Sequence, residues 1–207
     1  RFGSLYEAAK GEYKSLDIDF MNIYVNFANE NNIITLGQDN VEIRFEQASS
    51  GMQSIIPLWT VFLYGINKYK QATTIIEEPE LNLFPTLQVD LVNNLVSQMN
   101  KTQTNLLLTT HSPYILSVID NLIYAKDVYK KAEEANNEEL KNKITSLVPI
   151  ATMIEYENVA AYHCQDDGVV VRMNDDDIRS TGAYALDSAS MITGNIYNEL
   201  MNIDNEL

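Results

Sequence analysis

The sequence predicts an α/β protein in which parallel strands alternate with helices. Two short apolar runs, "ATTIIEEP" (residues 72–79) and "TNLLLTTHSP" (residues 104–113), have the composition of strands that are buried on both faces. A segment with helical character follows each run, and this order within about fifty residues is typical of a parallel sheet flanked by helices. With 207 residues and 45% hydrophobic content, the chain can bury one substantial core, so we expect residues 1–207 to form a single unit.

The first seventy residues are predicted to form a helix, two strands and a second, longer helix. Apolar residues around Phe20 and Phe27 follow helical spacing, which predicts a helix within residues 4–31. The segment "NIITLGQDNVEIRFE" alternates apolar and polar residues and predicts two strands joined by a turn at residues 37–40. The apolar stretch "ASSGMQSIIPLWTVFLYGINKYK" is too long for a strand and predicts a largely buried helix, with Pro57 near its start or at a kink.

Two prolines mark the starts of later helices. Pro85 suits the first turn of a helix after the first parallel strand, and Ser112 with Pro113 combines a capping hydroxyl with proline at the first helical position. Further on, "NVAAYHCQDDGVVVRM" predicts a small β-hairpin around residues 166–168. A C-terminal helix is predicted within residues 186–207, with apolar members from Leu186 to Ile203.

Charge and cysteine content narrow the possible function classes. The chain carries 29 acidic and 14 basic residues, a formal net charge of −15, which opposes electrostatic capture of a nucleic-acid backbone by this chain itself. Any DNA or nuclease partner is therefore expected to act through other segments. The one cysteine, Cys164, cannot form an internal disulfide, and no run of about eighteen apolar residues is present that would cross a membrane. We expect a cytoplasmic protein without a membrane partner.

Two adjacent carboxylates, Glu77 and Glu78, end the first predicted parallel strand. Ligands of α/β sheets bind where the carboxyl ends of the strands open into a crevice. At such a place Glu77 would hold Mg²⁺ through its water shell, and Glu78 would orient and polarise an attacking water. A glutamate pair taken alone is more often a solvated turn, and the motifs before and after it favour catalysis here.

Two further motifs are expected near the same strand ends. "TTHSP" places His111 after the second strand, where a neutral imidazole would accept or relay a hydrogen bond near a phosphate. "ASSGMQS" precedes the long helix, so the N–H groups and hydroxyls of Ser49, Ser50 and Gly51 would face an anion at a positive helix end. The serines would serve equally well as helix caps, because capping and phosphate binding use the same donors.

These three motifs, in this order, resemble the second half of an ABC-type ATPase head, in the AAA-family branch that includes the SMC, RecF-like and OLD-like ATPases. The likeness covers residues 41–120. "TTIIEEPELNLFP" is similar to a Walker B strand that continues into a D-loop at residues 81–84, and "LLLTTHSP" is similar to an H-loop. The resemblance implies that Glu78 is the catalytic glutamate, that Glu77 is on the metal side and that His111 is the switch histidine.

The same resemblance implies ATP and Mg²⁺ as cofactors and a second ATPase head as partner. "ASSGMQS" resembles a degenerate LSGGQ signature motif, which in the family binds the γ-phosphate of ATP held by the opposite subunit. ATP would then be sandwiched in a head-to-tail dimer. The residues implied to bind the nucleotide are Ser49, Ser50, Gly51, Gln53 and Asn82.

Two features depart from the family pattern. Glu77 stands where the family usually has Asp, so its carboxylate is one methylene further from the backbone. The P-loop pattern G-x-x-x-x-G-K-[ST] requires a Gly-Lys dipeptide, and none of the eight glycines is followed by lysine. The sequence also starts without Met. We therefore expect the Walker A lobe upstream of Arg1 and interpret the chain as a head fragment of an ATPase serving DNA repair, chromosome maintenance or phage defence.

Other interpretations stay open at this point. One is a non-catalytic interaction module that keeps the ABC-ATPase fold, and a weaker one is the ATPase subunit of a membrane transporter. The acidic residues 175–177 are interpreted as a solvated loop, because too few residues follow His111 for a Toprim nuclease domain. His163 and Cys164 are neighbours in a predicted strand and would point to opposite faces, which argues against a metal site.

Overall fold

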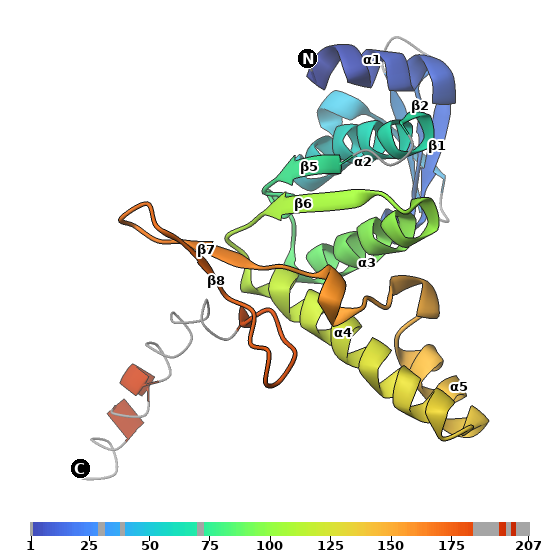
Figure 1. Ribbon diagram of the computed structural model, residues 1–207. Coiled ribbons are helices and arrows are strands. Elements are labelled where there is room, and N and C mark those ends of the chain that lie inside the picture. The colour runs from blue at the N-terminus through green and yellow to red at the C-terminus, as the bar shows by residue number, and fades with distance from the viewer. Residues whose placement is uncertain are drawn as a thin grey trace. The chain divides into compact units, whose positions relative to one another are not determined.

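The computed structural model divides the chain into two compact units, Arg1–Ile115 and Leu116–Leu207 (Figure 1). Helices and strands are mixed, so the chain has an α/β composition as predicted. The expectation that residues 1–207 are one ATPase-head fragment stays a prediction. The structure describes residues 2–28, 32–37, 40–69, 73–183, 195–197 and 200–201.

The first unit contains α1 (Phe2–Tyr13), β1 (Ser15–Ile18), η1 (Asp19–Met21), β2 (Ile23–Asn26), β3 (Ile33–Leu36), β4 (Val41–Arg44), η2 (Phe45–Gln47), α2 (Ser50–Lys68), β5 (Thr73–Glu77), α3 (Pro85–Thr102) and β6 (Asn105–Thr109). The helix α4 (Pro113–Glu134) begins in this unit and continues into the second. The second unit adds α5 (Glu138–Leu147), η3 (Ile150–Thr152), η4 (Tyr156–Asn158), β7 (Tyr162–Cys164) and β8 (Val170–Arg172). In the part of the chain that the structure describes, no helix has both the length and the apolar content to cross a membrane.

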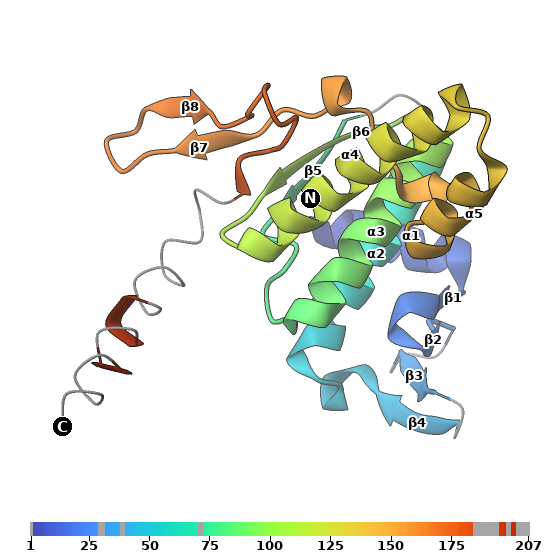
Figure 2. The same ribbon diagram turned by 90° about the horizontal axis from the view of Figure 1, so that it is seen from below.

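The strands β1 to β4 form an antiparallel sheet in chain order, as Figure 2 shows. The hairpin of β3 and β4 confirms the prediction, although residues 38 and 39 of its turn lie outside the described residues. The predicted helix within residues 4–31 is correct for α1 and wrong for β1 and β2. In β2, Ile23 and Val25 are buried and Tyr24 between them is 42% exposed, which is the two-residue period of a strand. So short an apolar segment fits both periods, and pairing with its neighbours decides for the strand.

The parallel pairing of β5 with β6 confirms the predicted strand order, with a register from Thr73↔Asn105 to Glu77↔Thr109. The two arrows point the same way in Figure 1. Burial on both faces, however, was a wrong prediction. Ile76 is 8% exposed in the core, whereas Ile75 is 64% and Leu107 is 48% exposed. These strands form a two-stranded sheet, so the wider parallel sheet of a P-loop ATPase stays a prediction.

The helix α2 carries much of the core of the first unit, as predicted. Ser49 caps its start, because the Ser49 hydroxyl oxygen accepts from the N–H of Met52 at 3.3 Å. Trp59 is 4% exposed, and its ring packs edge-on against Phe20 at a centroid distance of 5.2 Å. Pro57 lies inside the helix, which continues beyond it to Lys68. The same core includes residues of β2, β3, β5 and α3, and this packing fixes α2 against both sheets of the unit.

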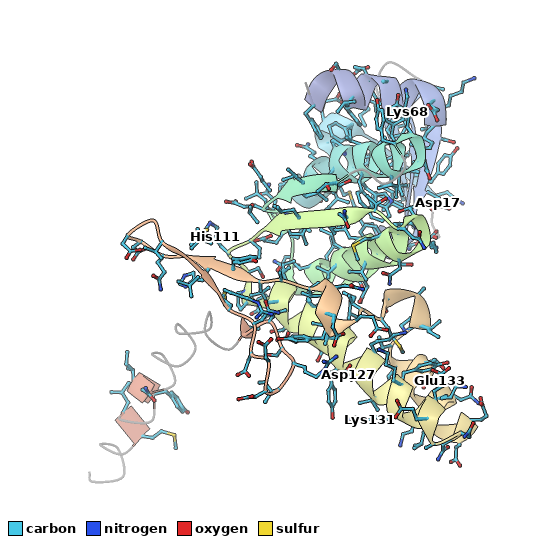
Figure 3. The ribbon with its side chains drawn as sticks, in the orientation of Figure 1. Asp17, Lys68, His111, Asp127, Lys131 and Glu133 are labelled. Atoms are coloured by element: carbon cyan, nitrogen blue, oxygen red, sulfur yellow. The ribbon has the colours of Figure 1, made fainter. Side chains whose placement is uncertain are left out.

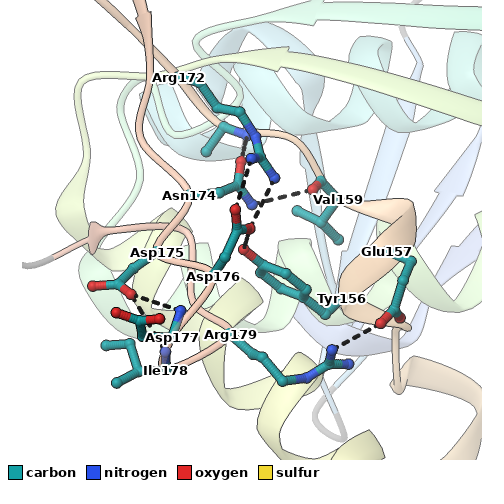
Figure 4. Close-up of polar contacts among 11 residues, drawn as sticks. Tyr156, Glu157, Val159, Arg172, Asn174, Asp175, Asp176, Asp177, Ile178 and Arg179 are labelled. Atoms are coloured by element: carbon teal, nitrogen blue, oxygen red, sulfur yellow. Dashed lines mark hydrogen bonds and ion pairs between the residues drawn. The ribbon is translucent and has the colours of Figure 1, made fainter.

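In the second unit, β7 and β8 form the predicted hairpin, with His163 opposite Val171. The loop that follows is held by polar contacts (Figure 4). Hydrogen bonds from Tyr156 and Arg172 hold the pKa of the Asp176 carboxyl below its ordinary value. Arg179 binds Asp127 of α4 at 2.7 and 3.0 Å. The C-terminal helix predicted within residues 186–207 lies mostly outside the described residues. The described residues of that segment, 195–197 and 200–201, are helical.

Candidate functional site

Glu77 and Glu78 lie at the carboxyl end of the parallel pair. Glu77 is the last residue of β5, and the N–H of Glu78 donates to the carbonyl oxygen of Thr109, the last residue of β6, at 2.9 Å. Glu78 has a φ of +43°, a left-handed conformation that is uncommon for a residue with a side chain. Such strained positions gather at functional sites, where the surrounding structure maintains them. Here the pairing with β6 fixes the backbone from which the Glu78 carboxylate projects.

His111 lies beside Glu78. The imidazole Nε2 is 3.6 Å from Oε1 of Glu78, and the two side chains are 89% and 46% exposed. Figure 3 marks His111 beyond the arrowhead of β6. The distance is longer than a hydrogen bond, and contacts of this kind tighten when substrate binds. The fold thus brings together the two residues predicted to be catalytic, and both are open to a ligand.

Glu77 is suited to a metal ion of one particular kind. It is exposed at the strand end, and among the described residues no group of three or more His, Cys, Asp or Glu side chains is arranged to hold a metal ion. Mg²⁺ in nucleotide sites is bound by one or two carboxylates, with waters and substrate phosphates supplying the other ligands. One exposed carboxylate fits the protein's share of that requirement, whereas the described residues contain no group of His, Cys, Asp and Glu side chains that could hold a metal ion alone.

The first turn of α2 presents the signature-like residues. Ser49 is the N-cap, and Ser50 and Gly51 follow it at the positive end of the helix, where the first N–H groups have no partner inside the helix. Gln53 has a different task in this structure. Its amide nitrogen donates to the carbonyl oxygens of the preceding loop, at 3.2 Å to Phe45, 3.3 Å to Glu46 and 3.1 Å to Ala48. Gln53 therefore holds the loop before α2, and its contact with a nucleotide stays a prediction.

Asn82 joins this loop to the turn that follows β5. Its side-chain nitrogen donates to the hydroxyl oxygen of Ser54 on α2 at 3.0 Å, and its φ is +64°. A Cβ atom added to Gly51 would lie 3.1 Å from the carbonyl oxygen of Asn82. The first turn of α2, which carries the signature-like residues, is thus in direct contact with the turn after β5, and glycine allows the close approach.

We expect Gly51→Ala and Gly65→Ala, both in α2, to affect stability differently. Nothing lies within 4 Å of a Cβ atom built on Gly65, so its replacement should raise the free energy of unfolding by about 0.5–1 kcal/mol. At Gly51 the added methyl group crowds Asn82, and we expect this variant to be about 1–3 kcal/mol less stable than Gly65→Ala. Urea unfolding followed by Trp59 fluorescence measures both. Equal stability of the two variants would contradict the close contact with Asn82.

A cavity of about 660 Å³ runs along β5 in the first unit. Glu77 and Glu78 line part of it, while apolar side chains of α1 and α2, among them Phe2 and Leu58, line the rest. Apolar walls do not suit a phosphate group. The apolar part of this cavity is therefore unsuited to a phosphate, and the polar part of the candidate site is the exposed strand end with Glu78 and His111.

The structure adds residues that sequence reasoning missed. Glu80 accepts hydrogen bonds from the loop after β6, and the buried side chains of Gln88 and Ser112 are hydrogen-bonded to each other at 2.6 Å. The only sequence signal for Glu80 is its place in "EEPE", two residues after Glu78. Residue spacing does not show that a side chain turns inward. From the sequence alone, Glu80 is therefore indistinguishable from an exposed carboxylate in a turn.

Comparison with known proteins places the site in a family. A family model described as an AAA ATPase domain matches residues 4–116, which is more than half of the chain. No curated protein matches the chain. The matched segment contains β5, β6 and every residue of the candidate site, and the match indicates a nucleotide-binding ATPase domain. The chain therefore belongs to the AAA ATPase domain family.

Proposed function

We propose that the chain is part of an ATP-hydrolysing head of the ABC type, in the SMC, RecF-like and OLD-like branch of ATPases. The observation that carries this proposal is the placement of Glu78 and His111 at the ends of two paired parallel strands, 3.6 Å apart. Both residues are exposed, and both lie within the segment that matches the AAA ATPase domain. An acid–base pair at this edge of an α/β sheet suits the activation of water against a phosphate.

Each residue of the site has a role in this proposal. Glu78 orients a water molecule and accepts its proton as the water oxygen attacks the γ-phosphorus and the bond to the leaving ADP oxygen breaks. His111 supplies a hydrogen bond near the same phosphate and keeps the Glu78 side chain in place. Glu77 holds Mg²⁺, which neutralises phosphate charge when bound. Ser49, Ser50 and Gly51 bind the γ-phosphate of ATP held by the opposite head.

The proposal needs two partners that the 207 residues do not supply. Because they contain no Gly-Lys dipeptide, a Walker A lobe from upstream sequence would bind the other phosphate oxygens. A second head would complete the ATP sandwich. The net charge of −15 opposes binding of a nucleic-acid backbone by this chain, so any DNA or nuclease contact is assigned in this proposal to other segments. The proposed setting is a cytoplasmic protein of DNA repair, chromosome maintenance or phage defence.

The test uses the longer protein that includes the sequence upstream of Arg1. We expect Mg²⁺-dependent phosphate release from ATP and an ATP-dependent increase in mass from monomer to dimer, measured by light scattering. A longer protein that neither binds Mg-ATP nor releases phosphate would overturn the proposal. That result would favour the second candidate, a non-catalytic interaction module with the ABC-ATPase fold, with which the missing Gly-Lys dipeptide is also compatible.

A further inference from the structure

Glu80 connects the two loops that carry the candidate catalytic residues. It lies in the turn after β5, and its Oε1 accepts from the hydroxyl of Thr110 at 2.6 Å and from the backbone N–H of His111 at 2.9 Å. Thr110 and His111 are in the loop after β6, thirty and thirty-one positions further along the chain. One carboxylate oxygen therefore fixes the backbone on which the His111 imidazole stands.

The second carboxylate oxygen of Glu80, Oε2, is buried and has no hydrogen-bond partner among the described residues. A buried oxygen of this kind is costly and rare, since folded proteins satisfy most buried polar groups. An exposed turn would let the carboxylate rotate into water and satisfy both oxygens. The fold instead keeps Glu80 turned toward Thr110 and His111. Since this orientation leaves one oxygen without a partner, we infer that the contact with the His111 loop has a functional role.

A chain of hydrogen bonds extends the connection into α3. The hydroxyl oxygen of Thr110 accepts from the N–H of Ser112 at 2.9 Å, and the hydroxyl of Ser112 donates to Oε1 of Gln88 at 2.6 Å. The Gln88 amide nitrogen then donates to the carbonyl oxygen of Leu83 at 3.1 Å, back in the turn after β5. These hydrogen bonds start and end in the turn after β5 and pass through the loop after β6 and through α3. The network therefore holds the two loops at a fixed separation.

We propose that Glu80 is a positioning residue for ATP hydrolysis, holding His111 opposite Glu78. This inference rests on the proposed function, in which those two side chains act on the γ-phosphate. Because 89% of the His111 side chain is exposed, packing cannot fix its position, and the position of its backbone decides where the imidazole lies. Glu80 therefore acts through His111 and need not touch the nucleotide.

An experiment without nucleotide tests the positioning directly. The chain has two histidines, so His163 in the hairpin serves as an internal reference for the imidazole NMR signals of His111. Glu80→Ala should shift or broaden the signals of His111 and leave those of His163 unchanged. Glu80→Gln keeps an oxygen acceptor and should restore the wild-type signals in large part. Should Glu80→Ala leave the His111 signals as in the wild type, the proposal is wrong.

Thr110→Val guards against a Glu80 variant that fails to fold. This substitution removes one of the two donors to Oε1 and keeps the shape of the side chain. We expect a smaller shift of the His111 signals than in Glu80→Ala, again without change at His163. His111 signals that stay as in the wild type in Thr110→Val would count against a connection through Oε1.

Steady-state kinetics of the longer protein test whether the effect of Glu80→Ala on ATP hydrolysis depends on His111. Glu80→Ala should lower kcat by roughly ten- to a hundredfold, with little change in KM for ATP, because a displacement of about 1 Å can cost that much. In a His111→Ala background, Glu80→Ala should cause no further loss. A loss of equal size in both backgrounds would overturn the proposal. A wild-type protein without phosphate release would overturn the proposed function instead, and the NMR comparison would still decide whether Glu80 positions His111.

Discussion

Glu78→Gln, made in the longer protein that includes the Walker A lobe, is expected to lower the rate of ATP hydrolysis by about 10²- to 10⁴-fold, the range over which general acid–base groups contribute. Glutamine has the length of glutamate and can still orient a water molecule, but it cannot accept the proton. The backbone of residue 78 should stay in place, because its N–H is bound to the carbonyl oxygen of Thr109 in β6. Binding of ATP should therefore be retained while the chemical step is lost.

Phosphate release at saturating Mg-ATP, together with direct measurement of ATP binding, checks this prediction. If an ATP-sandwich dimer forms, the variant should also accumulate as dimer in the presence of ATP, because it cannot return to the ADP state. Glu42→Gln is a matched control, since it makes the same chemical change at an exposed carboxylate of β4 and should hydrolyse ATP at the wild-type rate. Hydrolysis by Glu78→Gln at more than a tenth of the wild-type rate would show that another group accepts the proton.

The elements around the candidate site could be predicted because their sequence signals are local. Each parallel strand is a short apolar run that ends in polar residues, and the helices after them begin at Pro85 and Pro113. Parallel strands place their carboxyl ends at one edge, so the nearness of Glu78 and His111 follows from the strand assignment alone. Topology made that part of the site predictable before any side-chain contact was known.

The parts that could not be predicted depend on contacts between distant residues. In β2, a segment of four residues fits a helix or a strand, and the neighbours β1 and β3 make the choice. Burial of Ile75 and Leu107 was predicted from composition, but burial depends on what packs across the strand. Glu80 meets Thr110 only after β5 and β6 have paired. No window of the sequence contains these contacts, so they appear only in three dimensions.

Leu91→Ala is expected to lower the free energy of unfolding of the first unit by about 2–5 kcal/mol. Leu91 lies on α3, is fully buried and belongs to the same core cluster as Ile55 and Trp59. Its replacement removes buried apolar surface and leaves a cavity that the closely packed neighbours fill only in part. The single tryptophan lies in this core, so urea unfolding followed by Trp59 fluorescence reports on this unit.

Val89→Ala, on the same helix, is the control for Leu91→Ala. Val89 is 38% exposed, so we expect a loss of about 0.5–1 kcal/mol. Equal losses in the two variants would contradict the core position of Leu91.

The pair Leu91→Ala and Glu78→Gln also separates an effect on folding from an effect on the chemical step. Well below its unfolding temperature, folded Leu91→Ala should hydrolyse ATP at nearly the wild-type rate in the longer protein, because Leu91 is a buried core residue and not one of the candidate site residues. Glu78→Gln should unfold like the wild type and hydrolyse almost nothing. A Leu91 variant that lost activity while still folded would instead show that packing along α3 controls the site through Gln88 and Ser112.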